Sequence, residues 1–336
     1  MPFFVPPQET LKLVAPPLPS AKAIRFGKAI PCTVEDARLA EPAHPNFIPL
    51  SEGVTRVRRG NRWIDMKPAD STDEVKKLLF GVDGSIALER GRTYAGSYFE
   101  EPMSTRTAYI REGESERSIG PFVHFAWYRD RKNYVAYDGD QGEGNYGRMG
   151  TTLPKFFRVL DGEKEELGPG TPVRVWDPYH ILAVTLNGFD EDRPSPGSFP
   201  GTFLRYARKG RTDEIGDFNY LGSTPERRIF LAQPGVVAIW RDGRFSAVHR
   251  LPAGWQGLAS NPRGDVLLGS GLDKPDTRYS FAILCGGAMR RLTIPDVARL
   301  NQKRVRAVRD FRDDRSFVFT ASWTYDSLAF RVKSRN

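Results

Sequence analysis

Apolar and polar residues alternate along short stretches of this chain, and the stretches come in pairs that a polar turn separates. The clearest pairs read LLFGVDGSIAL (78–88), HFAWYRDRKNYVAY (124–137), VRVWDPYHILAVTL (173–186), FNYLGSTPERRIFLAQ (218–233), GLASNPRGDVLLGS (257–270) and VRAVRDFRDDRSFVFTA (305–321). Alternation with a period of two, broken by Gly, Pro or Asp, is typical of two antiparallel strands joined by a turn. We refer to these pairs as first-kind hairpins.

A second kind of hairpin falls between them. It reads TAYIREGESERSI (107–119), FFRVLDGEKEEL (156–167), FLRYARKGRTDEI (203–215), VAIWRDGRFSAV (237–248) and FAILCGGAMRRL (281–292). Most of these hairpins turn at a dipeptide such as Asp161-Gly162 or Asp242-Gly243, where Gly accepts the positive φ of a tight turn. One more hairpin (54–66) precedes the series and a single strand (328–334) follows it.

The two kinds of hairpin alternate, so together they form a repeated unit of four strands. The first-kind turns are centred near 83, 131, 178, 225, 262 and 313, a spacing of roughly 37 to 51 residues. This pattern predicts an all-β, six-bladed β-propeller of four-stranded antiparallel blades. A count of seven blades is the alternative, if residues 22–50 contribute to an additional blade. Short helices are expected only at 71–79 and 294–302.

One stretch also resembles a known repeat. GLASNPRGDVLLGS followed by SFAILCGGAMRRLTIP, and VVAIWRDGRFSAVHRL before them, are similar to the two halves of the HAF-type repeat. The resemblance covers roughly 235–295. It implies a propeller-like all-β fold of mostly unassigned function, in a family that is often extracellular.

Composition sets the domain and compartment predictions. The 336 residues are expected to form a Pro-rich, partly extended arm (1–50) and a single propeller domain (51–336). No basic leader opens the chain and no window approaches the roughly 18 apolar residues of a membrane span, so we expect a cytoplasmic protein. We also expect it to be monomeric. A secreted mature chain is the alternative. Cys32 and Cys285 are expected to be reduced, although a bridge between them is the other option.

In an antiparallel blade, the loops after the second and fourth strands emerge on the same face. These loops are rich in acidic and aromatic residues, although the chain as a whole carries a net charge of +9. Such side chains predict that this face binds another protein. The alternative is that the aromatic residues pack within their own loops. The predicted partner-binding residues are Tyr98, Glu100, Glu101, Tyr146, Phe189, Asp190, Glu191, Asp192, Trp255, Trp323 and Tyr325.

The segment DGDQGEGN (138–145) places carboxylates on a Gly-rich turn, as calcium loops do. Asp138, Asp140, Glu143 and Asn145 are the candidate calcium ligands. A Gly occupies the position of a third acid and no EF-hand glutamate follows, so a solvated loop is the alternative. No other cofactor is expected.

The sequence lacks a Gly-x-Ser-x-Gly elbow, a P-loop and an HExxH motif. We therefore predict a non-enzymatic propeller that binds a macromolecule, as a scaffold, a recognition module or an inhibitor. The alternative is a metal-dependent hydrolase or lactonase at the mouth of the central channel, with Asp138, Asp140 and His180 as candidates. Nucleic-acid binding rests on net charge alone and is not expected.

Overall fold

We analysed a computed structural model of the chain. It describes residues 18–36, 47–49, 55–59, 62–66, 74–94, 103–113, 115–138, 155–187, 201–271, 280–294, 304–309, 311–322 and 327–334. These ranges hold 29 strands and no helix, so the fold is all-β as predicted. None of their elements is a helix long and apolar enough to cross a membrane.

The chain divides into two compact units. Unit 1 comprises Met1–Leu13 and Pro42–Glu214, and unit 2 comprises Val14–Glu41 and Ile215–Asn336. The division into an arm (1–50) and one domain (51–336) stays a prediction. Residues 22–36 of that arm form three strands in the sheets of unit 2.

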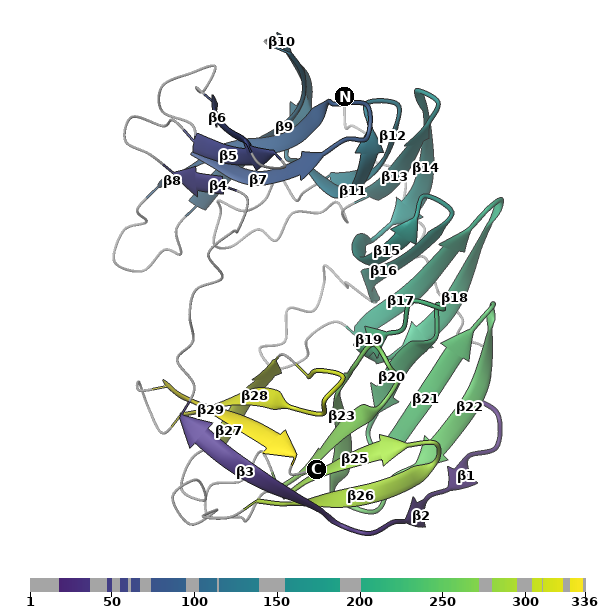
Figure 1. The fold of residues 1–336 in the computed structure, drawn as a ribbon. Coiled ribbons are helices and arrows are strands. Elements are labelled where there is room, and N and C mark those ends of the chain that lie inside the picture. Colours follow the sequence, from purple (N-terminus) through teal and green to yellow (C-terminus); the bar gives the residue numbers. More distant parts are fainter. Residues whose placement is uncertain are drawn as a thin grey trace, which may run out of the picture. The chain divides into compact units, whose positions relative to one another are not determined.

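Unit 1 is a succession of sheets, each built from strands that follow one another along the chain (Figure 1). The first is three-stranded and contains β4 (Phe47–Pro49), β5 (Thr55–Arg59) and β6 (Arg62–Met66). The next contains β7 (Glu74–Phe80), β8 (Ile86–Tyr94), β9 (Met103–Glu112) and β10 (Ser115–Pro121). Two more four-stranded sheets contain β11 (Val123–Asp130), β12 (Asn133–Asp138), β13 (Lys155–Leu160) and β14 (Glu163–Pro169), then β15 (Thr171–Asp177), β16 (His180–Asn187), β17 (Gly201–Arg208) and β18 (Arg211–Asp217).

Unit 2 continues the same pattern. Its first two sheets contain β19 (Asn219–Ser223), β20 (Ile229–Gln233), β21 (Val236–Arg241) and β22 (Arg244–Arg250), then β23 (Trp255–Ser260), β24 (Val266–Ser270), β25 (Ser280–Cys285) and β26 (Ala288–Thr293). β27 (Arg304–Arg309), β28 (Phe317–Ser322) and β29 (Ser327–Ser334) pair with one another and are joined to the edge of β26 by β3 (Ile30–Asp36), an N-terminal strand. Successive four-stranded antiparallel sheets of this kind are the blades of a β-propeller.

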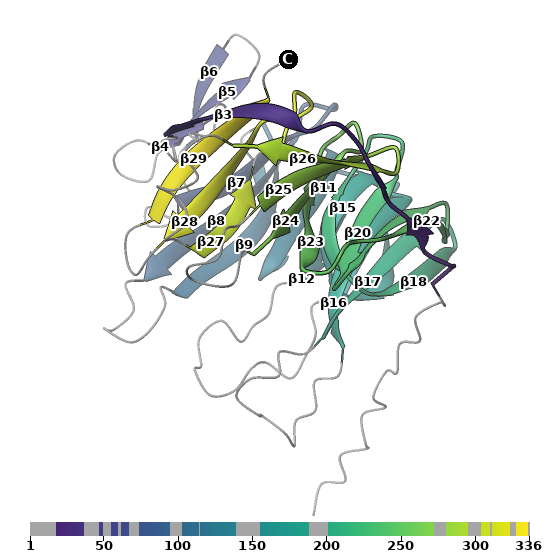
Figure 2. The same ribbon diagram turned by 90° about the horizontal axis from the view of Figure 1, so that it is seen from below.

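Three strands from the N-terminal part of the chain complete unit 2, and we call residues 22–36 the strap. β1 (Lys22–Ala23) pairs in parallel with β22, and β2 (Arg25–Phe26) pairs in parallel with β26. β3 (Ile30–Asp36) pairs in parallel with β26 on one side and antiparallel with β29 on the other. Figure 2 shows the strap running along the outer strands. Edges that would otherwise stay unpaired are thereby covered.

Alternate residues of the strap face the core of unit 2. Ile24 packs against a buried cluster that includes Phe230, Trp255 and Leu284. Cys32 is buried in a second cluster, against which Ile30 and Val34 also pack. The strap therefore joins two apolar clusters as well as three sheet edges.

The hairpin predictions are confirmed. All six first-kind pairs form the first and second strands of a sheet, and the five second-kind pairs form the third and fourth strands. Positive φ angles of 51° and 91° at Asp161 and Gly162 show the expected tight turn. The hairpin at 54–66 forms β5 and β6, in the sheet with β4, whereas the final strand pairs with β28 and β3.

The helix predicted at 71–79 is wrong, because Glu74–Phe80 forms β7. Val75 and Leu78 pair with residues of β8, and such tertiary pairing overrides a weak local preference for helix. The helix predicted at 294–302 lies outside the described residues, except for Ile294.

The first strand of each of the six first-kind hairpins carries a β-bulge. The register shifts lie between Val75 and Lys77, Phe125 and Trp127, Pro172 and Arg174, Tyr220 and Gly222, Gly257 and Ala259, and Val305 and Ala307. A bulge bends a strand and increases its twist. The six first-kind hairpins therefore share a backbone feature that no common residue marks.

Candidate functional site

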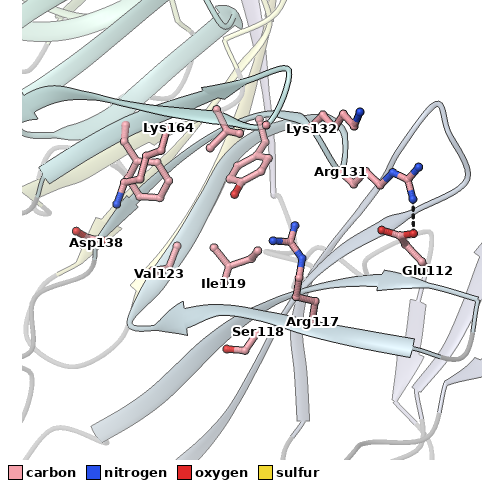
Figure 3. Close-up of a pocket in the computed structure, with 13 residues that line it drawn as sticks. Glu112, Arg117, Ser118, Ile119, Val123, Arg131, Lys132, Asp138 and Lys164 are labelled. Atoms are coloured by element: carbon pink, nitrogen blue, oxygen red, sulfur yellow. Dashed lines mark hydrogen bonds and ion pairs between the residues drawn. The ribbon is translucent and has the colours of Figure 1, made fainter.

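A groove lies in unit 1 between the sheet β7–β10 and the sheet β11–β14 (Figure 3). Its volume is about 450 Å³, which is within the usual range of small binding sites. We call it the unit 1 groove. It is lined by Glu112, Arg117, Ser118, Ile119, Val123, Arg131, Lys132, Tyr134, Asp138, Phe157, Val159, Gly162 and Lys164.

The floor of this groove is apolar. Val123, Phe157 and Val159 are buried there and belong to one core cluster, against which Ile119 packs. Tyr134 joins the same cluster, and burial raises the pKa of its hydroxyl while the charge of Arg117 opposes part of that rise. The tyrosine is therefore neutral at physiological pH and can serve as a hydrogen-bond donor.

The rim of the groove is mainly positive, with four basic side chains and two acidic ones among the lining residues. Arg131 donates a hydrogen bond to Glu112, which neutralises that pair. The ammonium of Lys164 lies 4.0 Å from the centre of the Phe157 ring, in cation–π contact. Figure 3 shows Arg117 on β10, Lys132 in the turn between β11 and β12, and Lys164 on β14 around the groove. An excess of positive charge thus surrounds an apolar floor.

A buried carboxylate joins the same two sheets of unit 1. Glu89 on β8 is only 1% exposed, and its Oε1 accepts a hydrogen bond of 2.8 Å from the N–H of Phe125 on β11. Its Oε2 lies 3.0 Å from Nδ1 of His124, and the Lys77 ammonium is 3.8 Å from Oε1. Burial alone would raise the pKa of Glu89, but His124 and Lys77 hold it below its ordinary value of 4.5. Glu89 therefore stays ionised and fixes the His124 ring.

A second buried ion pair stabilises the sheet β7–β10. The Arg90 side chain is 1% exposed and donates a hydrogen bond of 2.7 Å to Glu116 on β10. Arg111 lies 3.6 Å from the same carboxylate oxygen. Neither Arg90 nor Glu89 is recognisable from sequence as a buried charge, because the segment from residue 89 onward reads as a loop.

Of the predicted calcium ligands, the structure describes Asp138 alone. It ends β12 as a half-buried residue and lines the unit 1 groove. Asp140, Glu143 and Asn145 lie outside the described residues. Within the described ranges, no group of three or more His, Cys, Asp or Glu residues could hold a metal ion. Calcium binding stays a prediction.

Of the predicted partner-binding residues, the structure describes Trp255 alone. Its side chain is 7% exposed and packs in the apolar cluster of unit 2, so most of its ring surface is taken up by the core. The guanidinium carbon of Arg291 is 6.0 Å from the ring centre. Residues outside the described ranges are Tyr98, Glu100, Glu101, Tyr146, Phe189, Asp190, Glu191, Asp192, Trp323 and Tyr325.

His180, a candidate of the hydrolase hypothesis, lies at the first-kind turn between β15 and β16. Its Nδ1 is 2.8 Å from the carboxylate of Asp177, three residues earlier. This contact orients the imidazole within its own turn. The two cysteines are free thiols, as expected. Burial raises the pKa of Cys32 to about 11, and a hydrogen bond with Asp265 raises that of Cys285.

No protein-family model matches the chain, and a search of curated proteins finds no match. Solved structures give weak likenesses. The β-propeller domain of the Trilobed protease from Pyrococcus furiosus is 12% identical, with 78% of this chain and 84% of that one covered and a TM-score of 0.43. A prolyl endopeptidase is 11% identical, with 84% and 47% covered and a TM-score of 0.46.

A luciferin-regenerating enzyme is 10% identical, with 77% of this chain and 91% of that one covered and a TM-score of 0.32. Likenesses at these scores say nothing about activity. The HAF-type resemblance likewise stays a resemblance. The fold class rests on the sheets themselves: the chain is an all-β protein built from propeller blades.

Proposed function

We propose that this chain is a non-enzymatic, six-bladed propeller that binds another protein. The observation that carries the proposal is the unit 1 groove, in which an excess of basic side chains surrounds an apolar floor. The ligand that matches it is an extended protein segment with acidic residues on either side of an apolar one. Charge complementarity would set specificity and association rate, and the apolar residue would contribute most of the affinity.

The count of six blades follows the six first-kind hairpins, each with its bulge. In this count the strap strand β3 is the fourth strand of the blade β27–β29. The three-stranded sheet β4–β6 is the element that would make a seventh blade.

The acidic and aromatic loop face remains a second proposed surface, for a partner of the opposite charge. Its charge is negative, whereas the charge of the unit 1 groove is mainly positive, so the two surfaces predict different ligands. Reversing the charges of Asp190, Glu191 and Asp192 should weaken the binding of a basic partner and leave the binding of an acidic partner unchanged.

The test is the binding of a fluorescent decapeptide that alternates Glu with Leu, followed by anisotropy. We expect saturable binding that weakens as salt rises, since the rim charges are exposed to solvent. The double variant Arg117→Glu with Lys164→Glu should weaken binding at least ~10-fold, or about 1.4 kcal/mol. Arg129→Glu is the matched control, because Arg129 lies on β11, is 65% exposed and does not line the groove.

Two outcomes would overturn the proposal. One is that Arg129→Glu weakens binding as much as the double variant does, or that a Lys-Leu peptide binds equally well. The other is that no peptide binds while the purified protein retains a stoichiometric divalent metal. That result would favour the hydrolase hypothesis, with Asp138, Asp140 and His180 as the first residues to substitute.

A further inference from the structure

A second groove lies in unit 2, between the sheet β19–β22 and the sheet β23–β26, with the strap along its border. Its volume is about 380 Å³. We call it the unit 2 groove. It is lined by Lys22, Ala23, Arg25, Arg228, Phe230, Val237, Ile239, His249, Gly264, Val266, Leu284, Gly286 and Gly287.

The two grooves occupy the same place in the repeat. In the unit 1 groove, Tyr134 of the second strand pairs with Val159 of the third, just before the turn that contains Gly162. In the unit 2 groove, Val266 pairs with Leu284 in the same way, just before the Gly286-Gly287 turn. Both floors are therefore built by equivalent backbone positions, and their differences come from the side chains.

The main difference is charge. The unit 1 groove has Glu112 and Asp138 beside its four basic residues. Every charged or ionisable residue that lines the described part of the unit 2 groove is basic: Lys22, Arg25, Arg228 and His249. At the rim, Glu226 lies 3.9 Å from Arg228 and is itself 63% exposed. Among the described residues, the positive charge of this groove is thus largely uncompensated.

His249 adds an unsatisfied polar atom. Its Nδ1 is buried and has no hydrogen-bond partner in the described part of the chain. Its Cε1 faces the Gly287 turn, 3.5 Å from where a Cβ at that glycine would be. Burial and the nearby charge of Lys22 lower the pKa of the ring. A buried ring nitrogen without a partner is costly, and a bound ligand can offset that cost.

We infer that the unit 2 groove binds a small organic anion: a phosphate or carboxylate head attached to an aliphatic or aromatic body. The head would contact Lys22, Arg25 and Arg228, and His249 would complete its hydrogen bonds. The body would lie on Ile239, Val266 and Leu284, which together form the apolar wall. The volume fits a ligand of about drug size and excludes a folded partner.

Two of the four basic residues belong to the strap, so ligand binding and strap docking are linked. A ligand that contacts Lys22 and Arg25 binds only the docked strap and therefore stabilises it. Hydrogen exchange of residues 22–26 should slow when the site is filled. This readout does not depend on any activity of the protein.

The experiment uses the full chain, with 1-naphthyl phosphate and inorganic phosphate as probes in calorimetry and hydrogen exchange. We expect one saturable site for naphthyl phosphate, at least ~10-fold tighter than for inorganic phosphate, because the apolar wall contributes. Lys22→Glu and Arg228→Gln should each weaken binding several-fold. Lys28→Glu, which reverses an exposed strap charge outside the groove, is the matched control. We expect Arg228→Gln to retain its melting temperature, which would show that its loss of binding is not caused by unfolding.

The inference fails if naphthyl phosphate shows no saturable binding, or if both probes bind equally, which would indicate an adventitious ion only. It also fails if Lys28→Glu weakens naphthyl phosphate binding as much as Lys22→Glu does. The double variant of the unit 1 groove, Arg117→Glu with Lys164→Glu, should leave naphthyl phosphate binding unchanged. The experiments therefore test the two sites independently of each other.

Discussion

At the scale of single residues, Glu89 combines burial with charge. Its carboxylate is held by a backbone N–H and an imidazole from β11 and by an ammonium from β7. Since its pKa is lower in the folded protein, the group stabilises the fold above its unfolded pKa of about 4.5, and this contribution is lost as pH falls through the folded value.

We expect Glu89→Gln to lower the free energy of unfolding by about 3 kcal/mol at pH 7, because it leaves the buried contacts of the carboxylate uncompensated. Between pH 5 and the acid transition, the variant should lose less stability than the natural protein does. Urea unfolding at several pH values measures both effects. Glu166→Gln is the control, since Glu166 is 60% exposed and its ion pair contributes little. Equal losses for the two variants would contradict this role of Glu89.

The sequence places His124 in the first-kind hairpin at 124–137 but gives no sign of its partner, Glu89. Both ends of the stretch 89–106 are strand, since Gly91–Tyr94 pair with Met103–Arg106. Gly91 and the charged residues around it weaken any local strand signal. The pairing that orders them is supplied by β9, which no local pattern reveals.

At the scale of elements, the strap is the part of the fold with the clearest division between buried and exposed positions. Ile24 packs against the unit 2 core, whereas Phe26, two residues later, is 66% exposed. Ile24→Ala should therefore lower the free energy of unfolding by about 1–2 kcal/mol. Phe26→Ala should stay within about 0.5 kcal/mol. Thermal unfolding of both variants gives the comparison, and a larger loss for Phe26→Ala would mean that the strap docks differently.

The strap and the bulges also mark the limit of prediction from sequence for elements. Hairpins were predictable because each depends on neighbouring residues and a turn dipeptide such as Asp242-Gly243. The strap contacts β22 and β26 through two short parallel pairings, which leave no periodic signal over so few residues. The six bulges fall on unrelated residues, so composition does not distinguish them.

At the scale of the whole molecule, the two units differ in how the chain builds them. The sheets of unit 1 use only residues 47–217, in order. Unit 2 needs the strap as well as residues 219–334. The described sheets of unit 1 therefore come from one continuous stretch of the chain, whereas those of unit 2 come from two distant segments.

This difference predicts the behaviour of fragments. A fragment of residues 42–217 should unfold cooperatively and show protected amides by hydrogen exchange. A fragment of residues 215–336 should be poorly ordered, because the edges of β22, β26 and β29 lack their partners. Adding a peptide of residues 18–36 should restore its order, whereas the same peptide with Ile24→Asp and Val34→Asp should not. Full order without the peptide would contradict the structural role of the strap.

The candidate grooves are also features of this larger scale. Their residues come from both kinds of hairpin in adjacent sheets, for instance Lys132 from the turn of a first-kind hairpin and Lys164 from the last strand of a second-kind hairpin. Sequence reasoning directed attention to the long loops, where charge and aromatic content are concentrated. It missed the grooves because only the stacking of one sheet on the next brings their residues together.

The pairing of β3 with β29 has a consequence for synthesis of the protein. Val34 and Val332 are register partners separated by 298 positions (332 minus 34). Contacts this distant in sequence form slowly, since a long loop must close first. The strap segment must therefore wait until the residues up to β29 have been made. During that interval its apolar face and the open edges of unit 2 are exposed, so we expect the nascent chain to be prone to aggregation.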